Sequence, residues 1–297
     1  MTTLKTFLCT TAVTLSLLSL AGQQANAGQI YQDWNYGIDS FSDAYGGSEY
    51  EIKGMAIKEF GNQVYVGITG NMPLTGIKDE NINIGWSDLF FNFTGQNFQT
   101  ASNDQQLFAV RFVNNNNTSI TSGVYTAVKA KSTTTSHNGY SSLKEYYDHG
   151  WGKTNTQGTD FATKQSVYEY YYPTSIAHHP TTYNTLILNA IKSGTRIGDI
   201  SILSELNLST AGLDFGHFNA LGTQTFGFSF DKNLIANGDY VANLFLDCGN
   251  DGIALKGKGK VKSIPEPNPT TSLFVLGLVF SINQIRKSCK KSCSQLK

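Results

Sequence analysis

Charged side chains are scarce in this sequence. Only 15% of its 297 residues are Asp, Glu, Lys or Arg, against about a quarter in an ordinary globular protein. The 22 basic and 22 acidic residues cancel, so no basic surface predicts nucleic-acid binding. Hydrophobic residues still make up 40% of the chain, which is enough for a core and argues against wholesale disorder.

Cysteine is almost absent from the central part of the chain. Cys9 lies near the N-terminus, Cys289 and Cys293 lie near the C-terminus, and only Cys248 stands between them. A disulfide framework inside the body is therefore excluded unless a terminal cysteine reaches back. We expect Cys248 to be a buried free thiol.

The usual catalytic patterns are also missing. The sequence has no Gly-x-Ser-x-Gly elbow and no His-Glu-x-x-His pair. Cys248 and His217 would be the only thiol–imidazole pair, and nothing in the sequence brings them together. His178 and His179 are neighbours, which predicts a solvated pair on a loop and not a zinc site. We therefore predict that the protein is not an enzyme.

Glycine (29 residues) and tyrosine (15 residues) are abundant, and segments rich in Val, Phe, Tyr and Thr alternate with Gly, Asn and Asp. This pattern predicts an all-β fold, a single jelly-roll-like β-sandwich over residues 28–262. Residues 50–59 and 64–68, joined by Gly61 and Asn62, predict a hairpin. Further strands are expected at 88–93, 107–113, 123–131, 223–230 and 240–246.

Helical signals are few. Residues 187–191 predict a short helical turn, and residues 201–208 predict either another or a packed loop. The polar, Tyr-rich segment 132–185 predicts long loops or an insertion over one face of the sandwich. Trp86, which precedes the apolar Leu89 and Phe91, is expected in the core.

The N-terminus has the pattern of a secretory signal peptide over residues 1–27. Lys5 provides the positive start, residues 7–20 are mostly apolar, and Ala25 and Ala27 fit the small-residue subsites of signal peptidase. We expect cleavage after Ala27 and export of the chain.

The C-terminus, residues 263–297, carries a second ordered pattern. Pro265, Glu266 and Pro267 form an extended strip, and residues 269–285 follow as a short apolar segment near the lower length limit for crossing a bilayer. A basic cluster at 286–291 then predicts a cytoplasmic stop-transfer end. Its members are Arg286, Lys287, Lys290 and Lys291.

This triplet of features resembles the PEP-CTERM sorting signal over residues 264–291. The resemblance implies that Pro265, Glu266 and Pro267 are the recognition motif of a membrane-embedded exosortase. It also implies that the protein is anchored transiently in the inner membrane before it passes to the cell surface or the extracellular matrix. The residues beyond the start of the basic cluster, with Cys289 and Cys293, depart from the family pattern and bear on how efficiently the tail is processed.

Five segments of the body carry a second resemblance. They are residues 54–56 (Gly-Met-Ala), 71–76 (Asn-Met-Pro-Leu-Thr-Gly), 85–93 (Gly-Trp-Ser-Asp-Leu-Phe-Phe-Asn-Phe), 212–218 (Gly-Leu-Asp-Phe-Gly-His-Phe) and 250–255 (Asn-Asp-Gly-Ile-Ala-Leu). With these segments the body resembles a family of cyanobacterial exosortase-dependent surface proteins, a likeness that implies surface location and supplies no catalytic residues.

Two kinds of ligand site remain open on sequence grounds. Asp247, Asn250 and Asp251 offer oxygen ligands for calcium, although Lys258 stands where an EF-hand needs glutamate. Asp39 and Asp43 form a similar weak pair. No other cofactor is expected. Aromatic residues expected to be exposed in the polar insertion could stack on sugar rings, and they are Trp151, Tyr170, Tyr171 and Tyr172.

The sequence thus predicts an exported, non-enzymatic surface or matrix protein. The alternative is a carbohydrate-binding module that attaches the cell to exopolysaccharide. An exported hydrolase ranks third, because the sequence does not show which two carboxylates would form the pair that glycoside hydrolysis needs.

Overall fold

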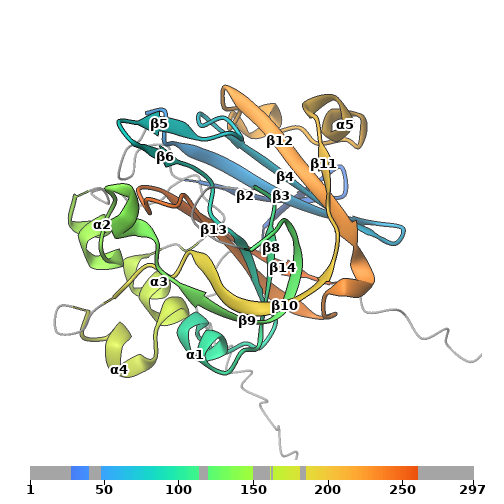
Figure 1. Cartoon of the computed structure of the whole chain (residues 1–297). Coiled ribbons are helices and arrows are strands. Elements are labelled where there is room, and N and C mark those ends of the chain that lie inside the picture. The colour runs from blue at the N-terminus through green and yellow to red at the C-terminus, as the bar shows by residue number, and fades with distance from the viewer. Residues whose placement is uncertain are drawn as a thin grey trace, which may run out of the picture.

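The fold is all-β. A computed structural model describes residues 28–39, 48–113, 120–149, 161, 163–180 and 185–259, and most of its strands form two six-stranded antiparallel sheets (Figure 1). The first sheet has the order β1 (Gln29–Tyr31), β2 (Trp34–Ile38), β3 (Ile52–Phe60), β4 (Gln63–Gly70), β12 (Gln224–Asp231) and β11 (Ser201–Leu203). The second has the order β10 (Ala190–Gly198), β9 (Gly123–Lys131), β8 (Leu107–Arg111), β7 (Leu89–Asn92), β13 (Asp239–Phe245) and β14 (Gly252–Lys258). A small hairpin joins β5 (Ile77–Asp79) and β6 (Ile82–Ile84).

The strand predictions are confirmed. The expected hairpin is β3–β4, and Gly61 at its turn has a φ of 60°, a left-handed conformation that favours glycine. The five other expected strands coincide, within a few residues at their ends, with β7, β8, β9, β12 and β13.

The strand order differs from that of a jelly roll. Consecutive strands β1 to β4 are hydrogen-bonded neighbours in the first sheet, and β7 to β10 are neighbours in the second. Such meanders replace the Greek-key connections of a jelly roll. The late strands β12 and β13 then pair with the early strands β4 and β7, so each sheet joins distant parts of the chain.

The facing sides of the two sheets share one hydrophobic core. Phe228 of β12, Phe91 of β7 and Leu244 of β13 are fully buried in it. Trp86 is also buried, as expected, with its ring 5.1 Å from that of Phe226 and its indole N–H donating to the Pro73 carbonyl at 3.1 Å. Because the indole N–H has a partner, burial of this large ring costs no unpaired donor.

The outer face of the second sheet is covered by helices, which are drawn on that side in Figure 1. Alternation along β13 explains this: Ala242 and Leu244 face the first sheet, whereas Val241 and Phe245 face the helices. The helices are α1 (Phe98–Asn103), α2 (Leu143–His149), α3 (Lys164–Tyr171) and α4 (Thr174–Ala177), with the 3₁₀ turn η1 (Thr134–His137). The described residues of the segment 132–185 thus cover one face, as expected, but with helices as well as loops.

A smaller core covers the outer face of the first sheet. Trp34 and Tyr36 of β2 pack there with Leu208 and Phe215. Leu208 belongs to α5 (Glu205–Thr210), and Phe215 directly precedes the 3₁₀ turn η2 (Gly216–Phe218). Another 3₁₀ turn, η3 (Lys232–Leu234), follows β12.

The two helical predictions fared differently. The expected turn at 187–191 is wrong, because the Asn189 N–H bonds to the Lys131 carbonyl and Ala190 and Ile191 begin the ladder of β10 with β9. In 201–208, residues up to Leu203 form β11 and α5 begins only at Glu205. Ser204 caps this helix by accepting from the Asn207 N–H, so the cap decides where the helix begins.

None of the helices within the described ranges combines the length and the hydrophobicity that crossing a membrane requires. The predicted signal peptide and the predicted sorting tail both lie outside those ranges.

Candidate functional site

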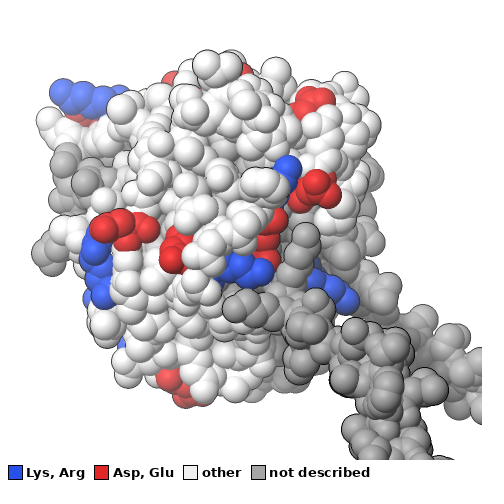
Figure 2. All heavy atoms as spheres, turned by 90° about the vertical axis from the view of Figure 1, so that its right-hand side faces the viewer, with Lys and Arg blue, Asp and Glu red and all other residues white. Residues whose placement is uncertain are grey.

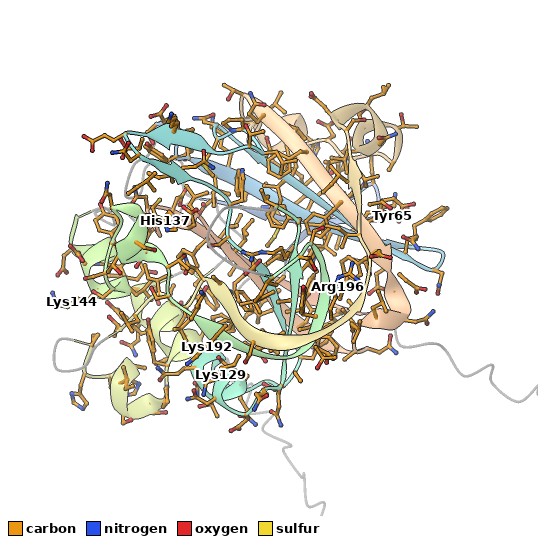
Figure 3. The ribbon with its side chains drawn as sticks, viewed as in Figure 1. Tyr65, Lys129, His137, Lys144, Lys192 and Arg196 are labelled. Carbon is orange, nitrogen blue, oxygen red and sulfur yellow. The ribbon has the colours of Figure 1, made fainter. Side chains whose placement is uncertain are left out.

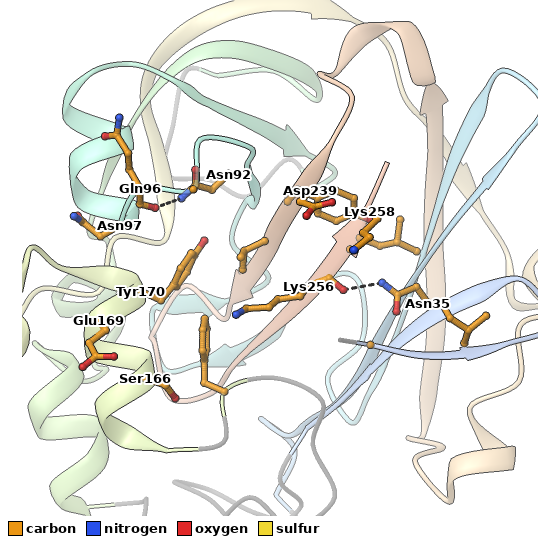
Figure 4. Close-up of a pocket in the computed structure, with 18 of the residues that line it drawn as sticks. Asn35, Asn92, Gln96, Asn97, Ser166, Glu169, Tyr170, Asp239, Lys256 and Lys258 are labelled. Carbon is orange, nitrogen blue, oxygen red and sulfur yellow. Dashed lines mark hydrogen bonds between the residues drawn. The ribbon is translucent and has the colours of Figure 1, made fainter. Parts of the chain in front are cut away.

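A cleft of about 1290 Å³ runs around the edge strand β14 (Figure 4). Its floor comes from β13 and β14, one wall comes from α3 and the segment before α1, and the other wall comes from β1, β2 and β3. Segments far apart in the sequence therefore meet here. Pockets for drug-sized ligands measure about 300–1,000 Å³, so this cleft has room for a larger or extended ligand.

Aromatic side chains line the helical wall. Tyr170 of α3 is partly exposed, and its ring stacks on Phe161 with centroids 5.0 Å apart and an interplanar angle of 29°. The Tyr170 hydroxyl donates to Asn243 Oδ1 at 2.9 Å. Burial raises the pKa of this phenol, so Tyr170 is a neutral, fixed platform at neutral pH.

The local sequence explains why Tyr170 is held in place. Thr163 caps α3 by accepting from the Ser166 N–H, while the Ser166 hydroxyl lies 3.2 Å from the Thr163 N–H as its acceptor. This capping box fixes the start of a short helix. Two turns later, Tyr171 is buried against Phe98 and Phe245, which anchors the end of the helix that presents Tyr170.

Amide side chains line the remainder of the cleft. Asn92 and Asn97 are partly engaged, since Asn92 Nδ2 donates to the Gln96 carbonyl at 2.9 Å and Asn97 Oδ1 caps α1. Asn35 Nδ2 donates to the Lys256 carbonyl at 2.8 Å and so covers the open edge of β14. Its Oδ1 is buried without a hydrogen bond to a described residue. Amide groups are both donors and acceptors, which suits a ligand rich in hydroxyl groups.

Two of the four described carboxylates that line the cleft, Glu59 and Glu169, are paired with neighbouring side chains. Glu59 pairs with Lys232. Glu169 accepts from Gln165 and contacts His178, and these hydrogen bonds, Gln165 first, lower the pKa of its carboxyl. A general acid needs a raised pKa, so Glu169 is poorly suited to protonate a leaving group.

Of the aromatic ligand candidates predicted from the sequence, the structure brings Tyr170 to the cleft and does not bring Tyr171 or Tyr172 there. Tyr170 lines the cleft, but Tyr171 and Tyr172 are 4% and 2% exposed, so their predicted exposure is wrong. Tyr171 packs against Phe245 of β13. Tyr172 is the extended residue that ends α3; its ring lies beside Tyr168, and its hydroxyl donates to the Leu186 carbonyl at 2.8 Å. Trp151 lies outside the described residues.

The calcium candidates lie in a turn between β13 and β14, away from the cleft. Asp251 accepts backbone N–H groups from Ile52 and Gly252 at 2.5 and 2.7 Å, so it holds the chain near β3. Asp247, Asn250 and Asp251 are all buried. Within the part of the chain that the structure describes, no group of three or more His, Cys, Asp or Glu side chains is arranged to hold a metal ion. Asp39 is buried, and Asp43 lies outside the described residues.

Asp247 instead faces His137, a contact that the sequence did not reveal. His137 Nε2 lies 3.5 Å from Asp247 Oδ2, and neither Asp247 oxygen accepts a hydrogen bond from a described residue. His137 Nδ1 lies 2.9 Å from the Thr133 carbonyl, which can only accept, so Nδ1 carries a proton. Burial raises the pKa of the Asp247 carboxyl from 3.8 to about 6, and His137 opposes this shift.

A hydrogen-bonded network surrounds this pair. Asn189 Nδ2 donates to the carbonyls of Leu246 and Asp247, and Asn189 Oδ1 accepts from the Thr133 N–H. Figure 3 shows His137 close to the body of the protein, while Lys144 of α2 points away from it.

Cys248 is buried, as expected, and burial raises the pKa of its thiol to about 12, so it is a poor nucleophile. His178 and His179 are exposed, as expected.

A second buried acid, Asp88, was also missed from the sequence. Its Oδ1 accepts from Arg111 Nε at 3.0 Å and its Oδ2 accepts from the Ile191 N–H at 2.7 Å. Burial raises the pKa of this carboxyl, and Arg111 and the Ile191 N–H oppose that shift. Asp88 therefore ties β7 to β8 and to the start of β10.

Comparison of the chain with protein-family models, with curated proteins and with solved structures finds no match. The site is therefore interpreted from its own geometry.

Proposed function

We propose that this chain is an exported, non-enzymatic protein of a bacterial cell surface or extracellular matrix, and that its β-domain binds polysaccharide in the cleft around β14. The two packed sheets would form one β-sandwich of meander topology over residues 28–262. The signal peptide and the PEP-CTERM-like tail support export and sorting, with signal peptidase and exosortase as processing partners.

The cleft is the observation that carries the binding function. It places the aromatic platform of Tyr170 and Phe161 beside amide side chains from two other walls. Aromatic faces and amide groups together match the apolar ring faces and the hydroxyl groups of a sugar. A volume of about 1290 Å³ suits several sugar units better than one small molecule.

The binding function is tested on a glycan array and by titration calorimetry with the purified full chain in mild detergent. We expect Tyr170→Ala to weaken polysaccharide binding about tenfold, which corresponds to about 1.4 kcal/mol, because it removes the platform. Tyr170→Phe keeps the ring and should bind nearly as the unaltered protein does. Phe60→Ala is the matched control, since Phe60 is an exposed aromatic outside the cleft. Absence of binding to every glycan would contradict the proposal.

Sorting is tested separately. We expect Glu266→Ala to leave the protein unprocessed in the inner membrane, because the motif that exosortase reads is altered. Mass spectrometry of the mature protein reads both termini at once. Normal delivery of the Glu266→Ala variant to the surface would show that this motif has no part in sorting.

A further inference from the structure

Two lysines of β14 line the cleft, and neither makes an ion pair with a described residue. Lys256 is half-buried, whereas Lys258 is exposed. On this strand Ala254 belongs to the helix-side core, and Lys256, two residues further, points to the same side. In Figure 4 its side chain extends toward Tyr170. Lys256 Nζ lies 5.7 Å from the centroid of Phe161, and it makes no ion pair or hydrogen bond with a residue in the described ranges.

Four described acidic residues line the cleft, and none of them, Asp33 included, makes an ion pair with the Lys256 ammonium group. Glu59 pairs with Lys232, and Glu169 is engaged by Gln165 and His178. Asp239 stands directly opposite Lys258 in the β13–β14 ladder, and Figure 4 shows both on the other side of Lys256 from Tyr170.

The environment of Lys256 favours an incoming anion. Lys256 is half-buried, and burial lowers the pKa of its amine because the charged form loses solvation. A ligand carboxylate would supply the missing counter-charge and accept from the three ammonium donors. The chain has no formal net charge, and charged side chains are sparse and of mixed sign on the face shown in Figure 2. Such a preference would therefore come from a lysine inside the cleft and not from a broad field.

We propose that the saccharide bound in this cleft is carboxylated, with a uronate carboxylate placed on Lys256 and its ring placed on Tyr170. This inference rests on the proposed polysaccharide-binding function and narrows its ligand class. The ammonium group and the aromatic platform lie side by side across the floor and the helical wall, which is the arrangement that one sugar ring with one carboxylate requires.

The test compares two probes of the same ring and length, an oligogalacturonate and its methyl ester, by calorimetry on the purified full chain. We expect the carboxylate form to bind about tenfold more tightly than the ester at neutral pH, because charge-assisted hydrogen bonds exceed neutral ones. This preference should shrink as salt concentration rises.

Three lysine variants locate the effect. Lys256→Met keeps an apolar stem over Phe161, and it should lose the preference while binding the ester as before, which also reports that it is folded. Lys258→Met, at the rim of the same cleft, and Lys192→Met, on β10 outside it (Figure 3), should keep the preference.

The outcomes separate this inference from the proposed function. Equal binding of both probes by the unaltered protein overturns the carboxylate inference and leaves polysaccharide binding standing. Preference that survives in Lys256→Met overturns the assignment to Lys256. Binding of neither these probes nor any glycan on the array overturns both.

Discussion

Asp88 and Asp247 are two acids of equal burial that the molecule treats differently. Both are about 1% exposed, and burial raises the pKa of each carboxyl. Asp88 has two close donors, Arg111 Nε and the Ile191 N–H, whereas neither Asp247 carboxylate oxygen accepts a hydrogen bond from a described residue and His137 Nε2 lies 3.5 Å away. The comparison teaches that burial alone does not decide whether an acid stabilises a fold; the donors that face it do.

The largest effect is expected from Asp88→Ala. Removal of this carboxylate leaves the Arg111 charge buried without its carboxylate partner and removes the acceptor of the Ile191 N–H at the start of β10. We therefore expect a loss of about 3–5 kcal/mol in the free energy of unfolding, measured by urea denaturation. Asp199→Ala is the matched control, because Asp199 pairs with Arg196 on the surface. It should cost less than about 1 kcal/mol. Equal losses in the two variants would contradict the role given to Asp88.

A smaller effect of opposite sign is expected from Asp247→Asn. The folded state holds the Asp247 proton more tightly than the unfolded chain does, so ionisation disfavours folding as pH rises from about 3.8 to about 6. The variant should therefore gain stability relative to the unaltered protein across that window, and keep the gain above it. A shift of about two pKa units sets an upper limit of about 3 kcal/mol. Urea titrations at a series of pH values measure the difference, and a difference that is independent of pH would refute this account.

The smallest effect is expected from Thr133→Val. The Thr133 hydroxyl lies 3.1 Å from both Asn189 Oδ1 and the Asp247 carbonyl. Its loss should cost about 1 kcal/mol, the usual net contribution of one hydrogen bond. Because no titrating group is removed, thermal melts should show the same cost at pH 4 as at pH 7. A cost that follows pH would place Thr133 in the ionisation of the Asp247–His137 pair.

Strands could be predicted where a short stretch of sequence carries the signal by itself. Composition rich in Val, Phe, Tyr and Thr between turn residues located β4 and β9, partial alternation located β3, and the Gly61–Asn62 turn joined β3 to β4. The short strands β1 and β11 and the edge strand β14 were missed, since three residues show no periodicity and the Lys and Gly residues of β14 obscure its alternation.

The candidate site was harder to predict for a physical reason. Its walls come from segments as far apart as Asn35 and Lys256, and only the completed sheets bring them together. The sequence identified Tyr170 as an aromatic candidate but could not separate it from its buried neighbours. The one available signal was the spacing within α3, because residues 167, 168 and 171 form its buried side and Tyr170 lies off that side.

The positions of β12 and β13 in the strand order determine when the two sheets can be completed. β12 lies between β4 and β11, and β13 lies between β7 and β14, so each sheet lacks an interior strand until residues 224–245 are present. Neither sheet can therefore be completed until nearly the whole body of the chain has been synthesised. For the export proposed above, this late completion would favour a chain that reaches the membrane before its sheets are closed.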